Sequence, residues 1–218
     1  MFVNWAVARA VFPRMAAAEQ PWQVRRGVER GVTVCAFVFA PYSALLLVRG
    51  GDLLRLFYGP AYAGRGAVVL AWLAFAPIAF GVAYLSAYAL YALDRSRTVL
   101  RISLLALVVN TAGNLLLIPV LTDVGAAITT TASYLLEAVV TLVILRRLVG
   151  RPRLLRSFAL PSVAALPAVG VLLLPGPVLA LAAGEGLVYL AGWLALTRRY
   201  DPEGLAVLRS LLPDRARS

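Results

Sequence analysis

Six long stretches of apolar, nearly uncharged residues constrain this chain more than any other feature. They lie at about 32–48, 66–93, 99–118, 124–145, 157–174 and 178–197. Because a helix rises about 1.5 Å per residue, each stretch is long enough, or nearly so, to cross a hydrocarbon core of about 30 Å. Only 14% of the residues are charged, against roughly a quarter in soluble domains. The sequence therefore predicts an all-α, polytopic transmembrane helical bundle of about six spans, with a kink at Pro77 in the second.

The arginines predict which side of the membrane each loop faces. All 21 basic residues are Arg, and most lie in clusters before the first stretch and after the second, fourth and sixth. The positive-inside rule places such clusters in the cytoplasm. Six crossings with both ends of the chain in the cytoplasm satisfy nearly every charge. The exception is the segment 49–65, which contains the pairs Gly50-Gly51 and Gly59-Pro60 and is predicted as an ordered external loop.

Several function classes are excluded by composition. The net charge of +11 would suit nucleic acid, but the arginines are placed as membrane topology requires, so no nucleic-acid partner is expected. Cys35 is the single cysteine and there is no His, which removes a disulfide framework, a Cys-rich metal site and histidine-based catalysis. We expect no metal and no cofactor.

Four segments carry a resemblance to a known family. They are VFPRMA at Val11 to Ala16, LLRLFYGPAY at Leu53 to Tyr62, ALYALDRSR at Ala89 to Arg97, and NTAGNLLLIPVLTDVGAAITTTAS at Asn110 to Ser133. In order and spacing, over roughly residues 1 to 147, they resemble the polysaccharide flippases of the multidrug/oligosaccharidyl-lipid/polysaccharide exporter superfamily, whose fold is MATE-like. One departure is the turn Leu121 to Gly125, where relatives usually have a shorter aromatic-Gly pair.

The resemblance implies a division of the chain. Residues 1–30 would be a truncated helix end and a basic cytoplasmic loop, because the chain begins inside an apparent helix. Residues 31–147 would be four transmembrane helices of the second flippase lobe, 148–200 an additional helix pair, and 201–218 a cytoplasmic tail. The family has two lobes of six helices, so a missing N-terminal lobe or a second copy of this chain would complete the transporter.

The resemblance also implies a function. A flippase of this kind moves a lipid-linked oligosaccharide, of the undecaprenyl pyrophosphate type, across the bacterial cytoplasmic membrane for cell-surface polysaccharide biosynthesis. It works by alternating access and without covalent chemistry, so no enzyme is expected; its partners are the glycolipid and membrane lipid. The alternatives are a multidrug-type exporter of the same superfamily, a membrane enzyme of lipid-linked sugar metabolism, and a purely structural subunit.

Glu137 is the most conspicuous polar residue within a predicted span. An ionised side chain at the centre of a bilayer costs about 2.5 to 3.5 kcal/mol on insertion scales. Thr130, Tyr134 and Thr141 lie at offsets that place them on the same helix face as Glu137. This face is interpreted as a cavity wall or a protonatable coupling site, or else as an interhelical hydrogen bond.

Two further stripes are candidates for substrate contacts. Ser103, Asn110 and Asn114 share one face of the third span, where bridging of two helices is favoured over binding of a sugar hydroxyl. Tyr84 and Tyr88 in the second span, followed by Tyr91, would stack on sugar rings or anchor the helix at the interface. Asn110, Asn114, Tyr134 and Glu137 are the preferred cavity wall.

Arg55 and Arg65 are the headgroup candidates, because an arginine on the external side has no topological reason to exist. Either could meet an anionic lipid headgroup, although a salt bridge to Asp52 would explain Arg55 equally well. The cytoplasmic Arg clusters could attract lipid pyrophosphate but are better explained as topology determinants. Glu185, between Gly184 and Gly186, is interpreted as a packing residue.

Overall fold

The computed structural model describes residues 2–200, and every regular element within that range is helical. The elements, in chain order, are α1 (Phe2–Ala16), α2 (Pro21–Tyr58), the 3-10 turn η1 (Pro60–Tyr62), α3 (Ala63–Leu73), α4 (Ala76–Ala92), α5 (Ser96–Leu121), α6 (Asp123–Val149), α7 (Leu154–Leu172) and α8 (Val178–Tyr200). Counting Pro60–Ala92 as one span, six segments of the described chain are long and apolar enough to cross a membrane. The predicted helical bundle of about six spans is confirmed; the tail predicted at 201–218 lies outside the described residues.

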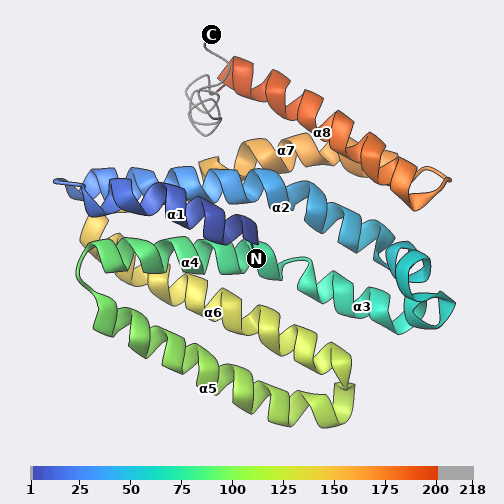
Figure 1. Cartoon of the computed structure of the whole chain (residues 1–218), viewed down its shortest axis with the longest axis horizontal. Helices are drawn as coiled ribbons and strands as arrows, with labels where there is room; N and C mark the ends of the chain where they lie inside the picture. Colours follow the sequence, from blue (N-terminus) through green and yellow to red (C-terminus); the bar gives the residue numbers. More distant parts are fainter. Residues whose placement is uncertain (1, 201–218) are drawn as a thin grey trace.

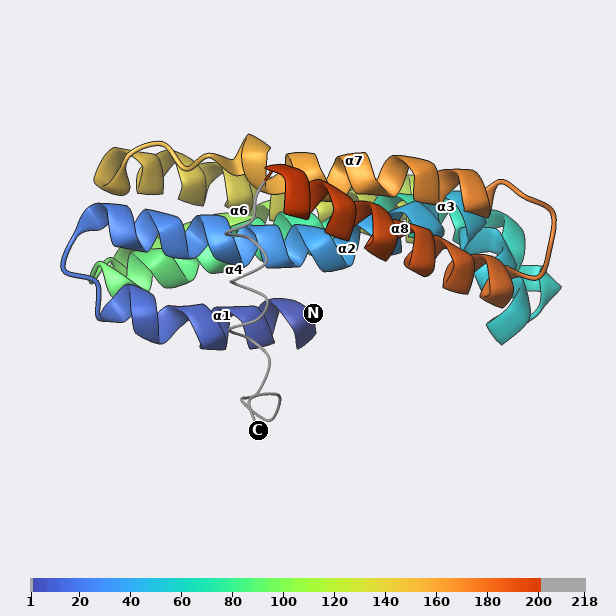
Figure 2. The same cartoon turned by 90° about the horizontal axis from the view of Figure 1, so that it is seen from above.

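The helices form an elongated bundle around α2 and α4. The long α2 packs against α1, α3, α4 and α7, while α4 packs against α1 and α6. Figure 1 shows the α5–α6 hairpin on one side of this centre and the α7–α8 pair on the other. Seen from above, α1 lies on the face of the bundle opposite α7 (Figure 2). Helices α1 and α7 therefore cover opposite faces of the central pair α2 and α4.

The Arg-rich connections between helices lie together at one end of the bundle. The connections from α1 to α2, from α4 to α5 and from α6 to α7 lie at one end of the bundle, on the left in Figure 1, and those from α2 to α3, from α5 to α6 and from α7 to α8 lie at the opposite end, while α3 and α4 meet in between. Contacts tie the first end together: the backbone N–H of Arg153 donates to Glu29 over 2.7 Å, and Gly150 lies against the guanidinium of Arg25. The Arg-rich connections thus share one end, as the positive-inside rule requires.

The helix α2 is much longer than the span expected at 32–48, and the boundaries expected from the sequence are wrong here. Residues 21–30, expected in a loop, are helical, and so is the Gly50-Gly51 pair. A kink replaces the expected turn, because Arg49 has non-helical backbone angles. The Arg49 side chain donates to the carbonyl oxygen of Leu172 at 2.7 Å and to that of Leu174, which satisfies carbonyls at the end of α7. The helix ends only at Gly59, whose φ of 96° suits glycine.

The kink predicted at Pro77 is confirmed as a complete break. The helix stops at Leu73 and restarts at Ala76, with Pro77 in the first turn of α4. Proline lacks the N–H that a continuous helix needs, and its ring clashes with the carbonyl of the residue four positions earlier, here Leu73, where α3 ends. The buried hydroxyl of Ser43 donates to the carbonyl of Ala74 over 2.6 Å, which satisfies an acceptor at the break. The break is therefore stabilised from α2.

Candidate functional site

A row of aromatic rings runs along one face of α4. The rings of Phe80 and Tyr84 stack with centroids 5.2 Å apart, Tyr84 and Tyr88 follow at 4.9 Å, and Tyr91 comes 5.9 Å from Tyr88. The hydroxyls of Tyr84 and Tyr88 lie within hydrogen-bonding distance, at 3.2 Å. The first three rings are half-buried, whereas Tyr91, at the helix end, is 44% exposed. Spacings of four and three residues keep all of them on one helical face.

Rings from two other helices join this row. Phe12 of α1 meets Tyr88 edge-on at 5.2 Å, and Tyr134 of α6 lies 5.1 Å from Phe80. We call the set Phe12, Phe80, Tyr84, Tyr88 and Tyr134 the aromatic row. Its rings are neither sealed in the core nor fully exposed, and three helices hold them. Such a surface offers ring faces and hydroxyl groups to a ligand.

Arg9 borders the aromatic row and was not among the residues singled out from the sequence. Its guanidinium lies 3.5 Å above the ring of Trp5, and Arg9 comes three residues before Phe12 on α1, a spacing that makes the two neighbours on the helix surface. Arg9 is exposed on α1. The sequence could have indicated Arg9, because it is a lone basic residue in an apolar segment, one helical turn after Trp5. This spacing allows a cation–π contact.

Glu137 lies on α6 one turn after Tyr134 and faces α5. Its carboxylate accepts a hydrogen bond of 3.1 Å from the hydroxyl of Ser103 and is half-buried. Thr130, two turns earlier on the same face, is also half-buried. Thr141 differs from the expectation: it is completely buried, and its hydroxyl donates to the backbone carbonyl of Glu137 at 2.6 Å. Of the four residues expected on this face, Thr130, Tyr134 and Glu137 are therefore accessible and Thr141 is not.

Asn110 and Asn114 connect helices. The Asn110 amide donates to Ser133 of α6 over 3.2 Å, and Asn114 donates to Asn110 over 3.1 Å. The first bond bridges α5 and α6, which is the arrangement favoured from the sequence, and the second lies within α5 and holds the Asn110 amide. The oxygen of the Asn114 amide is buried and has no partner among the described residues. The Asn pair thus lies in the α5–α6 interface, on the α6 face that carries Ser133 rather than on the aromatic row.

The two headgroup candidates have different surroundings. Arg65 forms an ion pair of 2.7 Å with Asp123 and also donates to Thr122 and to the carbonyl of Leu121, so it fastens α3 to the α5–α6 turn. Asp52 pairs with Arg49 at 2.8 Å. A salt bridge from Arg55 to Asp52, offered as its explanation, is therefore wrong, and Arg55 is exposed near the end of α2.

The site offers aromatic faces, hydroxyls, one carboxylate and one guanidinium. Residues 2–200 contain no group of three or more side chains that could hold a metal ion. Ring faces pack against the apolar faces of sugars, and carboxylate and hydroxyl oxygens bind sugar hydroxyls. The arrangement can therefore bind a polar, ring-containing ligand between membrane helices.

Comparisons with known proteins agree with this chemistry. A family model described as lipid II flippase MurJ matches residues 1–192. A protein of Haloferax volcanii described as probable flippase AglR is 30% identical over 139 residues, covering 62% of this chain and 29% of the relative, so the chain spans under a third of that relative's length. No solved structure matches the chain significantly. The expected family of flippases for lipid-linked substrates is confirmed, and the chain belongs to the lipid II flippase MurJ family.

Proposed function

We propose that this chain forms part of a transporter that moves a lipid-linked oligosaccharide across the membrane. The observation that carries the proposal is the aromatic row, because its half-buried rings from α1, α4 and α6, with the tyrosine hydroxyls, would suit a sugar in a member of a flippase family. Tyr84 and Tyr88 would stack on sugar rings, and Tyr134, Glu137 and Thr130 would bind hydroxyls beside them. Asn110 and Asn114 would shape the wall behind them by holding α5 on α6.

We also propose where this chain lies in a two-lobe transporter. The chain would contribute most of the second lobe of a MATE-like fold, in the multidrug/oligosaccharidyl-lipid/polysaccharide exporter superfamily, with 31–147 as four lobe helices and 148–200 as an extra pair. An N-terminal lobe or a second copy would face the aromatic row. Rocking of the two lobes would expose the cavity to each side in turn, without covalent chemistry and without a cofactor.

The proposed substrate is carried on undecaprenyl pyrophosphate in the bacterial cytoplasmic membrane, with both ends of this chain in the cytoplasm. Arg9 would supply a cation for the phosphate beside the sugar-binding rings, since guanidinium groups bind phosphate bidentately. Arg55 and, within its ion pair, Arg65 would meet headgroups at the opposite membrane surface. A carrier with two phosphates needs cations near the rings, and the position of Arg9 on α1, three residues before Phe12, supports this role.

The test is translocation of a fluorescent undecaprenyl pyrophosphate-linked saccharide in membrane vesicles from cells that express the protein from its own gene. Tyr84→Ala and Tyr88→Ala are expected to slow translocation by roughly 2- to 10-fold each, the value of one aromatic contact. Tyr88→Phe keeps the ring and should retain most of the rate. Tyr42→Ala is the matched control, because Tyr42 is 46% exposed on α2 outside the row. Unchanged rates in both alanine variants at normal protein levels would overturn the proposal.

A further inference from the structure

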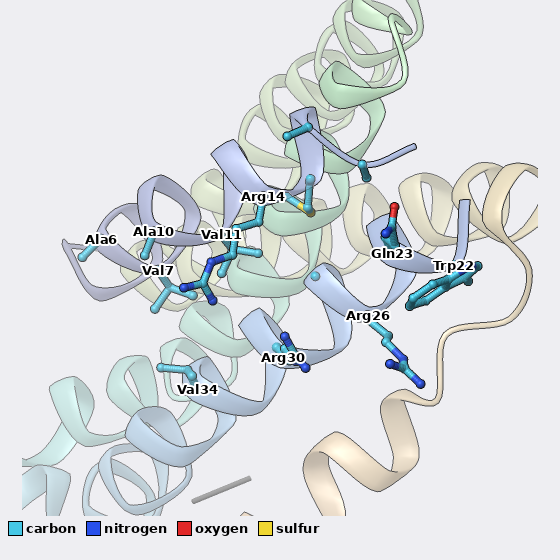
Figure 3. Close-up of a pocket in the computed structure, with 14 residues that line it drawn as sticks. Ala6, Val7, Ala10, Val11, Arg14, Trp22, Gln23, Arg26, Arg30 and Val34 are labelled. Atoms are coloured by element: carbon cyan, nitrogen blue, oxygen red, sulfur yellow. The ribbon is translucent and has the colours of Figure 1, made fainter. Parts of the chain in front are cut away.

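A groove between α1 and α2 lies at the Arg-rich end of the bundle. Its volume is about 610 Å³, and residues of both helices and of the loop between them line it. Figure 3 shows Arg14 extending from α1 toward α2, with Arg30 on α2 opposite it and Arg26 further along α2 near Trp22. None of the aromatic-row residues lines the groove. It is therefore a separate feature of the molecule.

The groove has an apolar part and a basic part. Its wall toward the middle of the bundle is formed by small apolar side chains, those of Ala6, Val7, Ala10, Val11 and Val34. Three arginines, Arg14, Arg26 and Arg30, line the same groove. The lining therefore combines apolar side chains with positive charge, as a ligand with a hydrocarbon chain and an anionic group requires.

The positive charge in the groove is not neutralised by its own lining. None of the fourteen lining residues is acidic. Glu29, the acid of α2 beside this region, pairs with Arg25 at 3.9 Å and accepts from the backbone of Arg153. Arg26 lies over the ring of Trp22, 4.8 Å from its centroid, and both side chains contribute to the lining. Three guanidinium groups from two facing helices suit a phosphate, which they bind through paired hydrogen bonds.

We propose that this groove binds an anionic phospholipid of the bilayer, with the phosphate among Arg14, Arg26 and Arg30 and an acyl chain along the apolar wall. Basic pockets between membrane helices on the cytoplasmic side are typical sites for anionic headgroups. The bound lipid holds the end of α1 against α2, because binding to the folded state stabilises it by mass action. This lipid is not transported, so the site is independent of the proposed function.

The test uses Trp22 as a reporter inside the groove. Purified protein in detergent is titrated with brominated phosphatidylglycerol or brominated phosphatidylcholine, and the quenching that disappears in Trp22→Phe is assigned to the groove. Phosphatidylglycerol is expected to quench at roughly 5- to 30-fold lower concentration than phosphatidylcholine. The double variant Arg14→Gln and Arg30→Gln should lose this preference, and the corresponding Lys variants should keep much of it.

Control variants separate the groove from general surface charge. Arg146→Gln with Arg147→Gln removes two exposed arginines from the last turn of α6, outside the groove, and should keep the preference. Equal quenching by the two lipids, or an unchanged preference in the Arg14 and Arg30 double variant, would overturn the proposal. Displacement of the lipid by soluble pyrophosphate at the same concentration would also overturn it, because the acyl chain would then contribute nothing.

Discussion

Glu137 is a carboxylate held within a membrane helix beside the aromatic row. The Ser103 hydroxyl donates to it, and it remains half-buried rather than sealed. A single hydroxyl donor leaves most of the hydrogen-bonding capacity of a carboxylate free. The Glu137 carboxylate can therefore still bind a proton or accept a hydrogen bond from a sugar hydroxyl.

We predict that Glu137→Gln keeps the fold and slows transport by about tenfold or more, or roughly 1.4 kcal/mol in the barrier. Gln has nearly the same shape and still accepts from Ser103, but it cannot take up a proton or carry a negative charge. The measurement is the vesicle translocation assay, with Glu19→Gln in the exposed α1–α2 loop as the control. A normal rate for Glu137→Gln would identify the residue as purely structural.

The residue-level predictions succeeded where they depended on helical spacing. Tyr84 and Tyr88 share a face because they are four residues apart, and the same rule placed Ser103 on the α5 face that carries Asn110. Contacts between helices followed no such rule. The partner of Arg65 proved to be Asp123 of another helix, which spacing alone does not reveal. Thr141 shares the face of Glu137 by angle, yet α6 packs closely there and buries it.

Among the helices, α2 shows why boundaries were harder to predict than spans. A charged stretch containing Gly50-Gly51 is typical of a turn, but the Arg49 side chain reaches the end of α7 and the helix continues through both glycines. That stabilisation comes from a segment more than a hundred residues away, so local composition carried no sign of it. In contrast, Pro77 acts on its own backbone, and the break at α4 was predicted from one residue.

The α5–α6 hairpin provides a test at the scale of elements. A Cβ added to Gly125 would lie 2.6 Å from the backbone carbonyl oxygen of Leu117, so α5 would have to move. We predict that Gly125→Ala destabilises the protein by about 1 to 3 kcal/mol, as overpacking does. The measurement is thermal unfolding in detergent. Gly186→Ala in α8 is the matched control, because nothing lies within 4 Å of its added Cβ; equal melting temperatures for the two variants would contradict the prediction.

Over the whole molecule, the distribution of arginines and the order of the helices together predict the orientation in the membrane. Counting α3 and α4 as one span, the spans alternate in direction, so the connections between them fall at two ends, and the Arg-rich connections fall at one of these ends (Figure 1). By the positive-inside rule, we predict that this molecule is oriented with its Arg-rich end in the cytoplasm. The phospholipid groove and the proposed headgroup residues depend on this orientation.

Cysteine labelling tests the orientation directly. The single native cysteine, Cys35, is 3% exposed and should not react, so Cys35→Ala gives a clean background. In that background we predict that Ser96→Cys, at the α4–α5 turn, reacts with a membrane-impermeant maleimide only after spheroplasts are permeabilised. Leu173→Cys, at the α7–α8 turn where the native side chain is 69% exposed, should react in intact spheroplasts. The reverse pattern would invert the membrane orientation and place the groove arginines at the external leaflet, where the phospholipid proposal would lose its physical basis.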